Sequence, residues 1–301
     1  MRAGWIPRDA SDVCEPSLKF CKGGISTERL QIPEIALRNG LRVPALSVGT
    51  YKVDNLREVL EAAFASGLRA VDTAEHYHNE AAVGEAISES GISRGELYLS
   101  TKIWNTDHGY QKTMDAFERS VERLRTEPDM LMIHWPCPMN GLYCETWRAL
   151  QDLLAAGRVR AIGVSNFTIA HLETLKALGG VQPMVNQIEM HLFYIDERML
   201  AYAHENGIQI EAWSPLLRGK SIVSHPLVVE LAEKYGVSPA QLAIRMLAQR
   251  GARVIVKSGN PAHIRENCKV FGFEIAPEDV ERLDSLNTHQ RSFQDPDAYF
   301  L

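Results

Sequence analysis

The chain has 301 residues and a mass of 33.7 kDa, so it forms one large domain or two small ones. Apolar residues make up 45% and charged residues 23%, which predicts a globular protein with a sizeable core and excludes a largely disordered chain. The net charge of −6 argues against non-specific nucleic-acid binding, because phosphate contacts need a basic surface. A small basic pocket for a phosphorylated ligand remains compatible with that charge.

The sequence indicates neither a membrane protein nor a disulfide-linked one. No apolar run approaches the roughly 18 residues of a membrane span, and the first thirty residues lack the apolar core of a secretory signal. The five cysteines form neither an even set nor a CxxC pair. We therefore expect reduced thiols in a cytoplasmic protein and regard zinc as a poor interpretation. The cysteines are Cys14, Cys21, Cys137, Cys144 and Cys268.

Residues 1–33 show no clear periodicity and end at Pro33, which predicts an irregular N-terminal arm before a single domain over 34–301. Residues 35–43 then alternate around Asn39-Gly40, the strongest short-range signal for a β-hairpin.

After the hairpin the chain alternates between short apolar runs and amphipathic stretches. The runs are rich in β-branched residues and occupy 46–49, 70–72, 97–101, 130–133, 159–164, 184–188, 208–212 and 253–256. The stretches between them have apolar residues at three- and four-residue spacing and include 56–66, 81–90, 112–125, 144–156, 169–178, 197–206 and 228–235. Eight strand–helix units predict a parallel α/β fold.

Two parallel architectures compete, an open doubly wound sheet and a closed (β/α)8 barrel. Eight evenly spaced strands favour the barrel. The first strand–helix turn reads Gly49-Thr-Tyr-Lys-Val, so it lacks the GxGxxG of a dinucleotide-binding open sheet, and no GxxxxGK[ST] occurs. We therefore predict a (β/α)8 TIM barrel, with the hairpin covering its N-terminal end.

Barrel enzymes carry their chemistry at the C-terminal ends of the strands, where this sequence has an aspartate, a tyrosine, a lysine and a histidine. Each has an ordinary alternative explanation: Asp72 as a helix cap, Tyr77 as a packing residue, Lys102 as a snorkelling side chain, and His134 as a core histidine. Together they are better explained as a site, because a lysine and an aspartate at a barrel mouth lose hydration unless they pair. A tyrosine beside that lysine should have its pKa lowered from about 10, which suits an acid near neutral pH.

Several ordered motifs from residue 34 onward resemble the aldo-keto reductases. They are DTAEHYHNE at 72–80, Lys102 before Trp104, IHWP at 133–136, GVSNF at 163–167 and VKS at 256–258. The resemblance implies an NAD(P)H-dependent carbonyl reductase on a (β/α)8 barrel, without a metal. By this resemblance, Tyr77 would donate a proton to the carbonyl oxygen of the substrate, and Lys102 would lower the pKa of Tyr77. Asp72 would hold Lys102 by a salt bridge, and His134 would orient the carbonyl.

The resemblance also implies binding residues. Those expected to hold the cofactor are Thr50, Ser165, Asn166, Gln187, Trp213, Ser214, Leu216, Lys257, Ser258, His263, Glu266 and Asn267. Those expected to line the substrate pocket are Tyr51, Glu75, His76, Trp104 and Trp135, a mostly aromatic set that suits apolar or aryl aldehydes and small ketones. The tail after Leu286 is short, so we expect a thin C-terminal wall.

His263 stands where the family usually has an arginine for the adenosine 2′-phosphate. Arginine offers a permanent two-pronged donor, whereas histidine is largely neutral near pH 7. We therefore expect NADPH as the cofactor, with NADH possible, and a weaker preference than usual. Val256 also departs from the proline that is common there.

Two other functions remain open at this level. A regulatory or structural barrel would bind the nucleotide but turn over poorly, and a metal-free hydrolase would need a carboxylate pair that the strand ends lack. We expect a small carbonyl compound as the partner, no nucleic acid or membrane, and a monomer or weak dimer.

Overall fold

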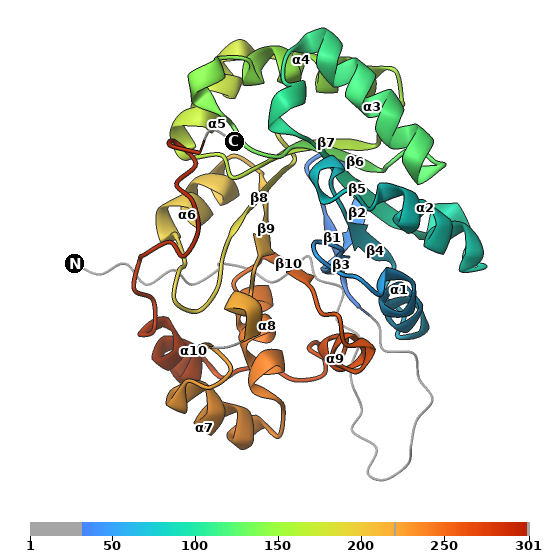
Figure 1. Cartoon of the computed structure of the whole chain (residues 1–301). Coiled ribbons are helices and arrows are strands. Elements are labelled where there is room, and N and C mark those ends of the chain that lie inside the picture. Colours follow the sequence, from blue (N-terminus) through green and yellow to red (C-terminus); the bar gives the residue numbers. More distant parts are fainter. Residues whose placement is uncertain (1–31, 220, 300–301) are drawn as a thin grey trace.

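The computed structural model describes residues 32–219 and 221–299, so the predicted arm lies outside the described residues apart from Ile32 and Pro33. Eight parallel strands close into a barrel in the order β10-β3-β4-β5-β6-β7-β8-β9, and helices surround it (Figure 1). Each strand pairs with its neighbour in the sequence, and β10 closes the ring against β3. The (β/α)8 barrel predicted from the sequence is confirmed.

The barrel strands begin and end close to the predicted positions. Their bounds are β3 Leu46–Gly49, β4 Ala70–Asp72, β5 Tyr98–Ile103, β6 Met130–Ile133, β7 Ala161–Ser165, β8 Val185–Glu189, β9 Gln209–Trp213 and β10 Arg253–Val256. Four strands extend one or two residues further toward their C-terminal ends than expected, because the closed ladder continues to pair beyond the apolar run. Lys102, Ser165 and Trp213 therefore lie within strands, and the strand alternation sets their side-chain directions.

The bounds of the α-helices in the described part of the chain are α1 Leu56–Ala65, α2 Glu80–Glu89, α3 Tyr110–Leu124, α4 Tyr143–Ala155, α5 Ile169–Leu178, α6 Glu197–Glu205, α7 Pro226–Tyr235, α8 Pro239–Gln249, α9 Pro261–Asn267 and α10 Pro277–Asp284. The sequence analysis did not name α8, α9 and α10. The start of α8 had a local signal, since Ser238 and Gln241 form a capping box and Pro239 occupies the first turn.

The hairpin of β1 (Glu34–Ala36) and β2 (Arg42–Pro44) covers the N-terminal end of the barrel. Its Leu37 and Val43 belong to one buried cluster with residues that open the barrel strands. These strand residues are Ala70, Tyr98, Met130, Ala161 and Val185. The other end of the barrel is left for the loops that follow the strands.

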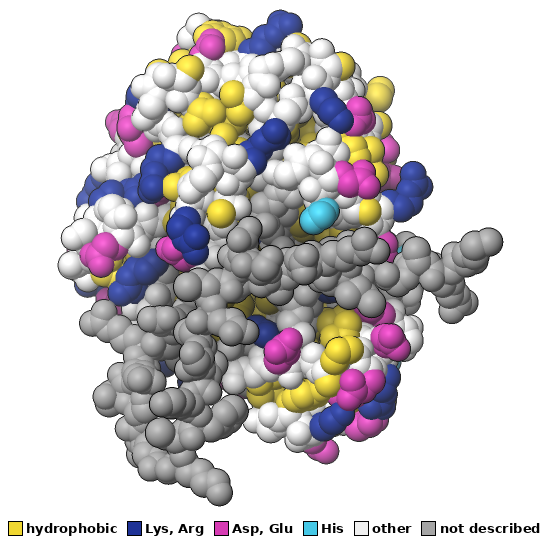
Figure 2. Space-filling view, turned by 180° about the vertical axis from the view of Figure 1, so that it is seen from behind, with side chains coloured by type: hydrophobic (Ala, Val, Ile, Leu, Met, Phe, Trp, Pro, Cys, Tyr) yellow, Lys and Arg dark blue, Asp and Glu magenta, His cyan; other side chains and the backbone are white. Residues whose placement is uncertain are grey.

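The surface carries charges of both signs. Seen from behind, basic and acidic side chains are interspersed over the described surface, with small apolar patches between them (Figure 2). No helix in the described ranges is long and apolar enough to cross a membrane.

Candidate active site

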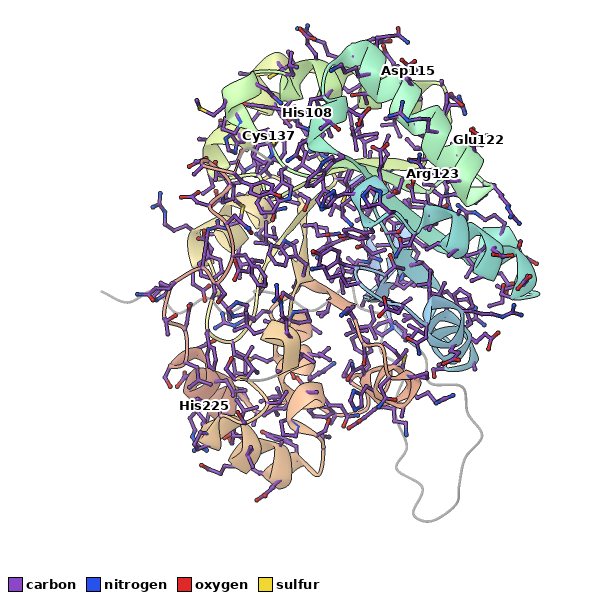
Figure 3. The ribbon with its side chains drawn as sticks, viewed as in Figure 1. His108, Asp115, Glu122, Arg123, Cys137 and His225 are labelled. Atoms are coloured by element: carbon purple, nitrogen blue, oxygen red, sulfur yellow. The ribbon has the colours of Figure 1, made fainter. Side chains whose placement is uncertain are left out.

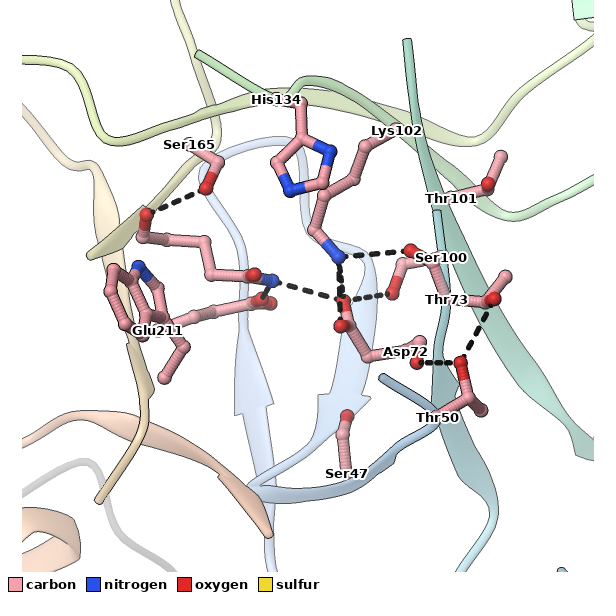
Figure 4. A network of polar contacts seen from close by, with 12 residues as sticks. Ser47, Thr50, Asp72, Thr73, Ser100, Thr101, Lys102, His134, Ser165 and Glu211 are labelled. Atoms are coloured by element: carbon pink, nitrogen blue, oxygen red, sulfur yellow. Dashed lines mark hydrogen bonds and ion pairs between the residues drawn. The ribbon is translucent and has the colours of Figure 1, made fainter. Parts of the chain in front are cut away.

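Asp72 and Lys102 form a buried ion pair at the C-terminal end of the barrel (Figure 4). The Lys102 Nζ donates to both carboxylate oxygens of Asp72, at 2.8 and 2.9 Å, and to the carbonyl oxygen of Thr73 at 2.9 Å. Ser100 Oγ donates to Asp72 Oδ2 at 3.0 Å. All three of the ammonium's donor directions are used within the protein, so the lysine side chain is held in one place.

The pair follows from strand register. Asp72 is the last residue of β4 and lies opposite Ser100 of β5. Ser100 and Lys102 are two residues apart, so both side chains point to the barrel interior, where Asp72 meets them. The intervening Thr101 points outward and donates to the buried carboxylate of Glu80 on α2, at 2.6 Å.

Tyr77 reaches the same place from the 3-10 turn Glu75–Tyr77 that follows β4. The Lys102 Nζ lies 5.2 Å from the centroid of its ring. Burial raises the pKa of Tyr77, and Lys102 lowers it by less, so the pKa lies above its ordinary value. The expected net lowering is therefore wrong for the protein alone, because removing the phenolate from water outweighs the ammonium.

The ammonium itself is stabilised. Burial lowers the pKa of Lys102, but the charge of Asp72 and the neighbouring Tyr77 outweigh that effect and leave the pKa raised. Lys102 is therefore a permanent cation beside the phenol.

His134 follows β6 and completes the group. Its ring centroid lies 5.6 Å from that of Tyr77, in an edge-on arrangement. Burial, with the charge of Lys102, lowers the pKa of His134 well below 6.5, so the imidazole is neutral at physiological pH. Its buried Nδ1 has no hydrogen-bond partner within the described part of the chain.

The predicted pocket residues surround these groups. His76 stacks on Trp104, with ring centroids 3.6 Å apart and planes 9° from parallel, and His76 lies 6.3 Å from His134. Tyr51 is exposed and contacts Tyr77, at 4.9 Å between centroids. Burial lowers the pKa of His76, with a smaller contribution from His78, so the His76 imidazole beside Trp104 is uncharged at neutral pH.

The C-terminal tail contributes more to the site than expected. Tyr299 packs on Trp135 with centroids 4.3 Å apart, and Phe293 meets Trp213 edge-on at 5.0 Å. The guanidinium of Arg218 lies 5.4 Å from the Phe293 ring centroid. The expectation of a thin wall is wrong, because a short tail places two aromatic rings at the mouth. Phe293 and Tyr299 are six residues apart in a segment without helical or strand periodicity, so the sequence contained no signal for this packing.

Three of the expected cofactor residues form one hydrogen-bonded group. Trp213 Nε1 donates to Asn166 Oδ1 at 2.9 Å, and Asn166 Nδ2 donates to Ser165 Oγ at 3.0 Å and to the His134 carbonyl at 3.0 Å. Trp213 keeps part of its surface exposed, whereas Ser165 and Asn166 are buried. An indole beside amide and hydroxyl groups is thus presented at the rim next to His134.

Thr50 and Gln187 are also brought to this end but are engaged with the protein. Thr50 is fully buried, and its hydroxyl donates to the Asp72 carbonyl at 3.1 Å. Gln187 Nε2 donates to Asp72 Oδ2 and to Glu211 Oε2, both at 3.0 Å. The amide nitrogen of Gln187 is therefore fully used, and only its oxygen remains for a ligand.

The expected nucleotide-binding residues of the eighth unit lie in the loop after β10 and on α9. Lys257 and His263 are exposed, Ser258 and Glu266 are half-buried, and Asn267 is buried. The Ser258 hydroxyl lies 3.4 Å from His263 Nδ1, so these two polar groups share one surface.

An open surface hollow of about 570 Å³ lies between the loop after β9 and the tail. Arg218, Ser221 and Ser292 line it, together with Leu217, Phe293 and Gln294. Ser214 and Leu216, which we expected at the cofactor, belong to the same loop. Ser214, Leu217 and Arg218 all have positive φ angles, of 56°, 45° and 61°. Strained backbone of this kind concentrates at ligand-binding loops.

Glu75, which was expected to line the pocket, is instead bound to charged residues behind the site. Its carboxylate lies within 3.4 Å of Arg119 and Arg123 of α3, so it turns away from the pocket, and the sequence analysis missed these two arginines. Arg123, labelled in Figure 3, also donates to the buried Glu80 at 2.7 Å. Helical spacing on α3 was the available signal, since Arg119 and Arg123 are four residues apart.

The described cysteines are free thiols. Figure 3 shows Cys137 with His108 beside α4. Burial raises the pKa of Cys137 and of Cys268 to about 11, so neither thiol is ionised at neutral pH. Among the described residues no group of three or more His, Cys, Asp or Glu side chains could hold a metal ion.

Comparison with known proteins identifies the family of this chain. The aldo/keto reductase family model matches residues 44–221 and 224–288. The glyoxal reductase of Bacillus subtilis is 42% identical over 267 residues, which cover 87% of this chain and 96% of the relative. An aldo/keto reductase crystal structure from Brucella melitensis has a TM-score of 0.81 at 38% identity and covers 85% of this chain and 100% of that chain. A Bombyx mori aldo-keto reductase in complex with NADP has a TM-score of 0.82 at 30% identity, over 88% of this chain and 95% of that chain. The chain therefore belongs to the aldo/keto reductase family.

Proposed function

We propose that this protein reduces aldehydes and ketones to alcohols with NADPH, and that Tyr77 is the proton donor. The observation that carries the proposal is the placement of Tyr77, His134 and the buried Asp72–Lys102 pair at one end of the barrel. The name of the Bacillus subtilis relative, a glyoxal reductase, supports carbonyl reduction, and the Bombyx mori structure with NADP supports the cofactor.

The side chains divide the work of stabilising a developing alkoxide. NADPH, when bound, supplies the hydride that adds to the carbonyl carbon. Tyr77 donates its phenolic proton to the carbonyl oxygen, and its raised pKa keeps that proton in place at neutral pH. Lys102 stabilises the phenolate that remains, and Asp72 holds Lys102 in position. The neutral imidazole of His134 offers a second preorganised donor to the same oxygen.

The residues present fit a dinucleotide. Trp213 has an exposed surface on which a flat ring can stack, and the Gln187 oxygen is free to accept from an amide nitrogen. The open hollow lined by Arg218 and Ser221 combines a cation with a hydroxyl, which suits a diphosphate. Lys257 is the exposed cation for a 2′-phosphate, with Ser258 and His263 nearby.

The Tyr77→Phe variant tests the proposal. It removes the donated proton but keeps the ring contact with Tyr51, so cofactor affinity should stay near the wild-type value. Loss of a positioned general acid typically lowers turnover by about 10²–10⁴-fold. We expect this loss in NADPH oxidation with a reactive aryl aldehyde.

The matched control is Tyr110→Phe, which removes an exposed phenol on α3 that is bonded to Asp152 instead of to the site. Activity of Tyr77→Phe within a few-fold of the control would remove Tyr77 from the acid role. Tight NADPH binding by the wild type without turnover on a broad carbonyl panel would favour the regulatory barrel.

A further inference from the structure

The interior of this barrel contains a buried ion pair that the reductase site does not account for. The core of a (β/α)8 barrel is usually filled by branched apolar side chains. Here Arg253 of β10 and Glu211 of β9 are register partners, and their side chains form an ion pair with exposures of 0% and 1%. Arg253 also donates to the Ser47 hydroxyl and the Pro44 carbonyl.

The Arg253–Glu211 pair is connected to Lys102 through the side-chain amide of Gln187 and the carboxylate of Asp72. Gln187 of β8 is the register partner of Glu211, and its Nε2 bridges Glu211 Oε2 and Asp72 Oδ2 at 3.0 Å each. Asp72 in turn holds Lys102 at 2.8 Å. Figure 4 shows Glu211, Asp72 and Lys102 of this group together in the barrel interior. Its charges run positive, negative, negative, positive, with the amide between the two carboxylates.

We propose that Glu211 and Arg253 are positioning residues for carbonyl reduction: Glu211 holds the Gln187 amide in one orientation, and Arg253 cancels the negative charge of Glu211 that would otherwise act on Asp72 and Lys102. This proposal rests on the proposed reductase function. The two hydrogens of one amide nitrogen are directed at two carboxylates, so a flipped Gln187 would place its oxygen against both of them. The amide oxygen is thereby kept on the opposite side from the carboxylates.

The electrostatic half of the proposal has a definite sign. Tyr77 is faced by Lys102 and Asp72 from the barrel, by His134 and His76 at the rim, and by Tyr51. Arg253 is faced by Glu211, and its guanidinium carbon lies 4.8 Å from the ring centroid of Tyr98. The charge of Asp129 also acts on Tyr98 and raises its pKa. Glu211 already raises the pKa of Lys102, and Asp72 raises that of Tyr77. Added negative charge therefore makes Tyr77 a weaker acid, and removed negative charge makes it a stronger one.

Two single variants are expected to shift the pH profile in opposite directions. In Arg253→Met the charge of Glu211 is uncompensated. The alkaline limb of the pH profile, where kcat at saturating NADPH falls as the pH rises, should therefore move to higher pH by about one unit. In Glu211→Gln the guanidinium is uncompensated, so the limb should move down by a similar amount. The double variant contains neither charge, and its limb should return close to that of the wild type.

The control is Arg250→Met, which removes another arginine from an ion pair: Arg250 caps the C-terminal end of α8 and pairs with Asp284 of α10, outside the barrel. It should lower stability without moving the limb. Limbs that coincide in all variants, or that move in the same direction in both single variants, would overturn the proposal. If Arg253→Met does not fold, the downward shift of Glu211→Gln decides the question alone.

A second readout separates this proposal from the function it rests on. The ionisation of Tyr77 can be followed without turnover, by ultraviolet titration of each variant against the same variant carrying Tyr77→Phe. A wild type that reduces no carbonyl compound would overturn the proposed function, while opposite shifts in this titration would still support the effect of the pair on Tyr77. Absent shifts in an active enzyme would overturn the pair's role alone.

Discussion

Replacing Asp72 by Asn should damage this protein twice, in stability and in catalysis. The Asp72 carboxylate accepts hydrogen bonds from Lys102, Ser100 and Gln187, and three of them converge on Oδ2. An asparagine can place its single oxygen at that position, but its NH2 group then faces the Lys102 ammonium, donor against donor. The change leaves a buried cation without its counter-charge.

The magnitude follows from the burial of the pair. The side chains of Lys102 and Asp72 are 0% and 4% exposed, so solvent screens little of the interaction. Removing one partner of such a pair costs about 3–5 kcal/mol, a large part of the roughly 5–15 kcal/mol that stabilises a typical domain. Lys102 should then lose its proton more easily, so Tyr77 should lose the cation that stabilises its phenolate, and carbonyl reduction should fall.

Urea unfolding of a double-mutant cycle measures this effect. Asp72→Asn and Lys102→Met should each lower the unfolding midpoint strongly, and the double variant should lose less than the two changes added together, since neither orphaned charge remains. Glu61→Gln, which breaks an exposed pair with Arg57, is the control and should leave the midpoint almost unchanged. Additive losses, or a loss of under about 1 kcal/mol for Asp72→Asn, would refute the reasoning.

Three further predictions concern packing, pH and cofactor choice. In Gly84→Ala, the new Cβ would lie 2.4 Å from the Leu124 carbonyl oxygen, so α2 and α3 must separate; we expect about 1–3 kcal/mol of destabilisation and a lower Tm, and no change in Gly95→Ala, where nothing lies within 4 Å. Burial lowers the pKa of His108 to about 4, so between pH 6.5 and pH 4 the unfolded chain takes up a proton that the folded one does not. The free energy of unfolding should therefore decrease as the pH is lowered from 6.5 to 4, by at most about 1.4 kcal/mol per pH unit from this residue. Urea unfolding of His108→Leu at several pH values should show a smaller decrease, and equal slopes for the two proteins would contradict the assignment. In His263→Arg, a permanent guanidinium joins the exposed Lys257 surface, and the NADPH-to-NADH ratio of kcat/KM should rise about tenfold, mainly through KM; an unchanged ratio would place this residue away from the phosphate.

The sequence alone was enough to predict the barrel and the four central residues, because both depend on local patterns. Strand–helix alternation is a periodicity of neighbouring residues, and parallel strands in a barrel bring their C-terminal ends to one rim. Asp72, Lys102 and His134 each sit at or near a strand end, so their convergence with Tyr77 could be expected before any contact was known. The helix α8 was missed although its capping box is also a local pattern.

Only the tertiary structure decided how those residues are tuned and what stands behind them. The direction of the pKa of Tyr77 depends on how much water the closed barrel excludes, and no spacing in the sequence encodes that. Gln187 donates to two carboxylates from strands β4 and β9, which are far apart in the chain and meet only across the barrel interior. Arg253 and Phe293 likewise acquire their contacts from ring closure and from the path of the tail. Long-range register and burial, which arise only when the barrel closes, determine these interactions.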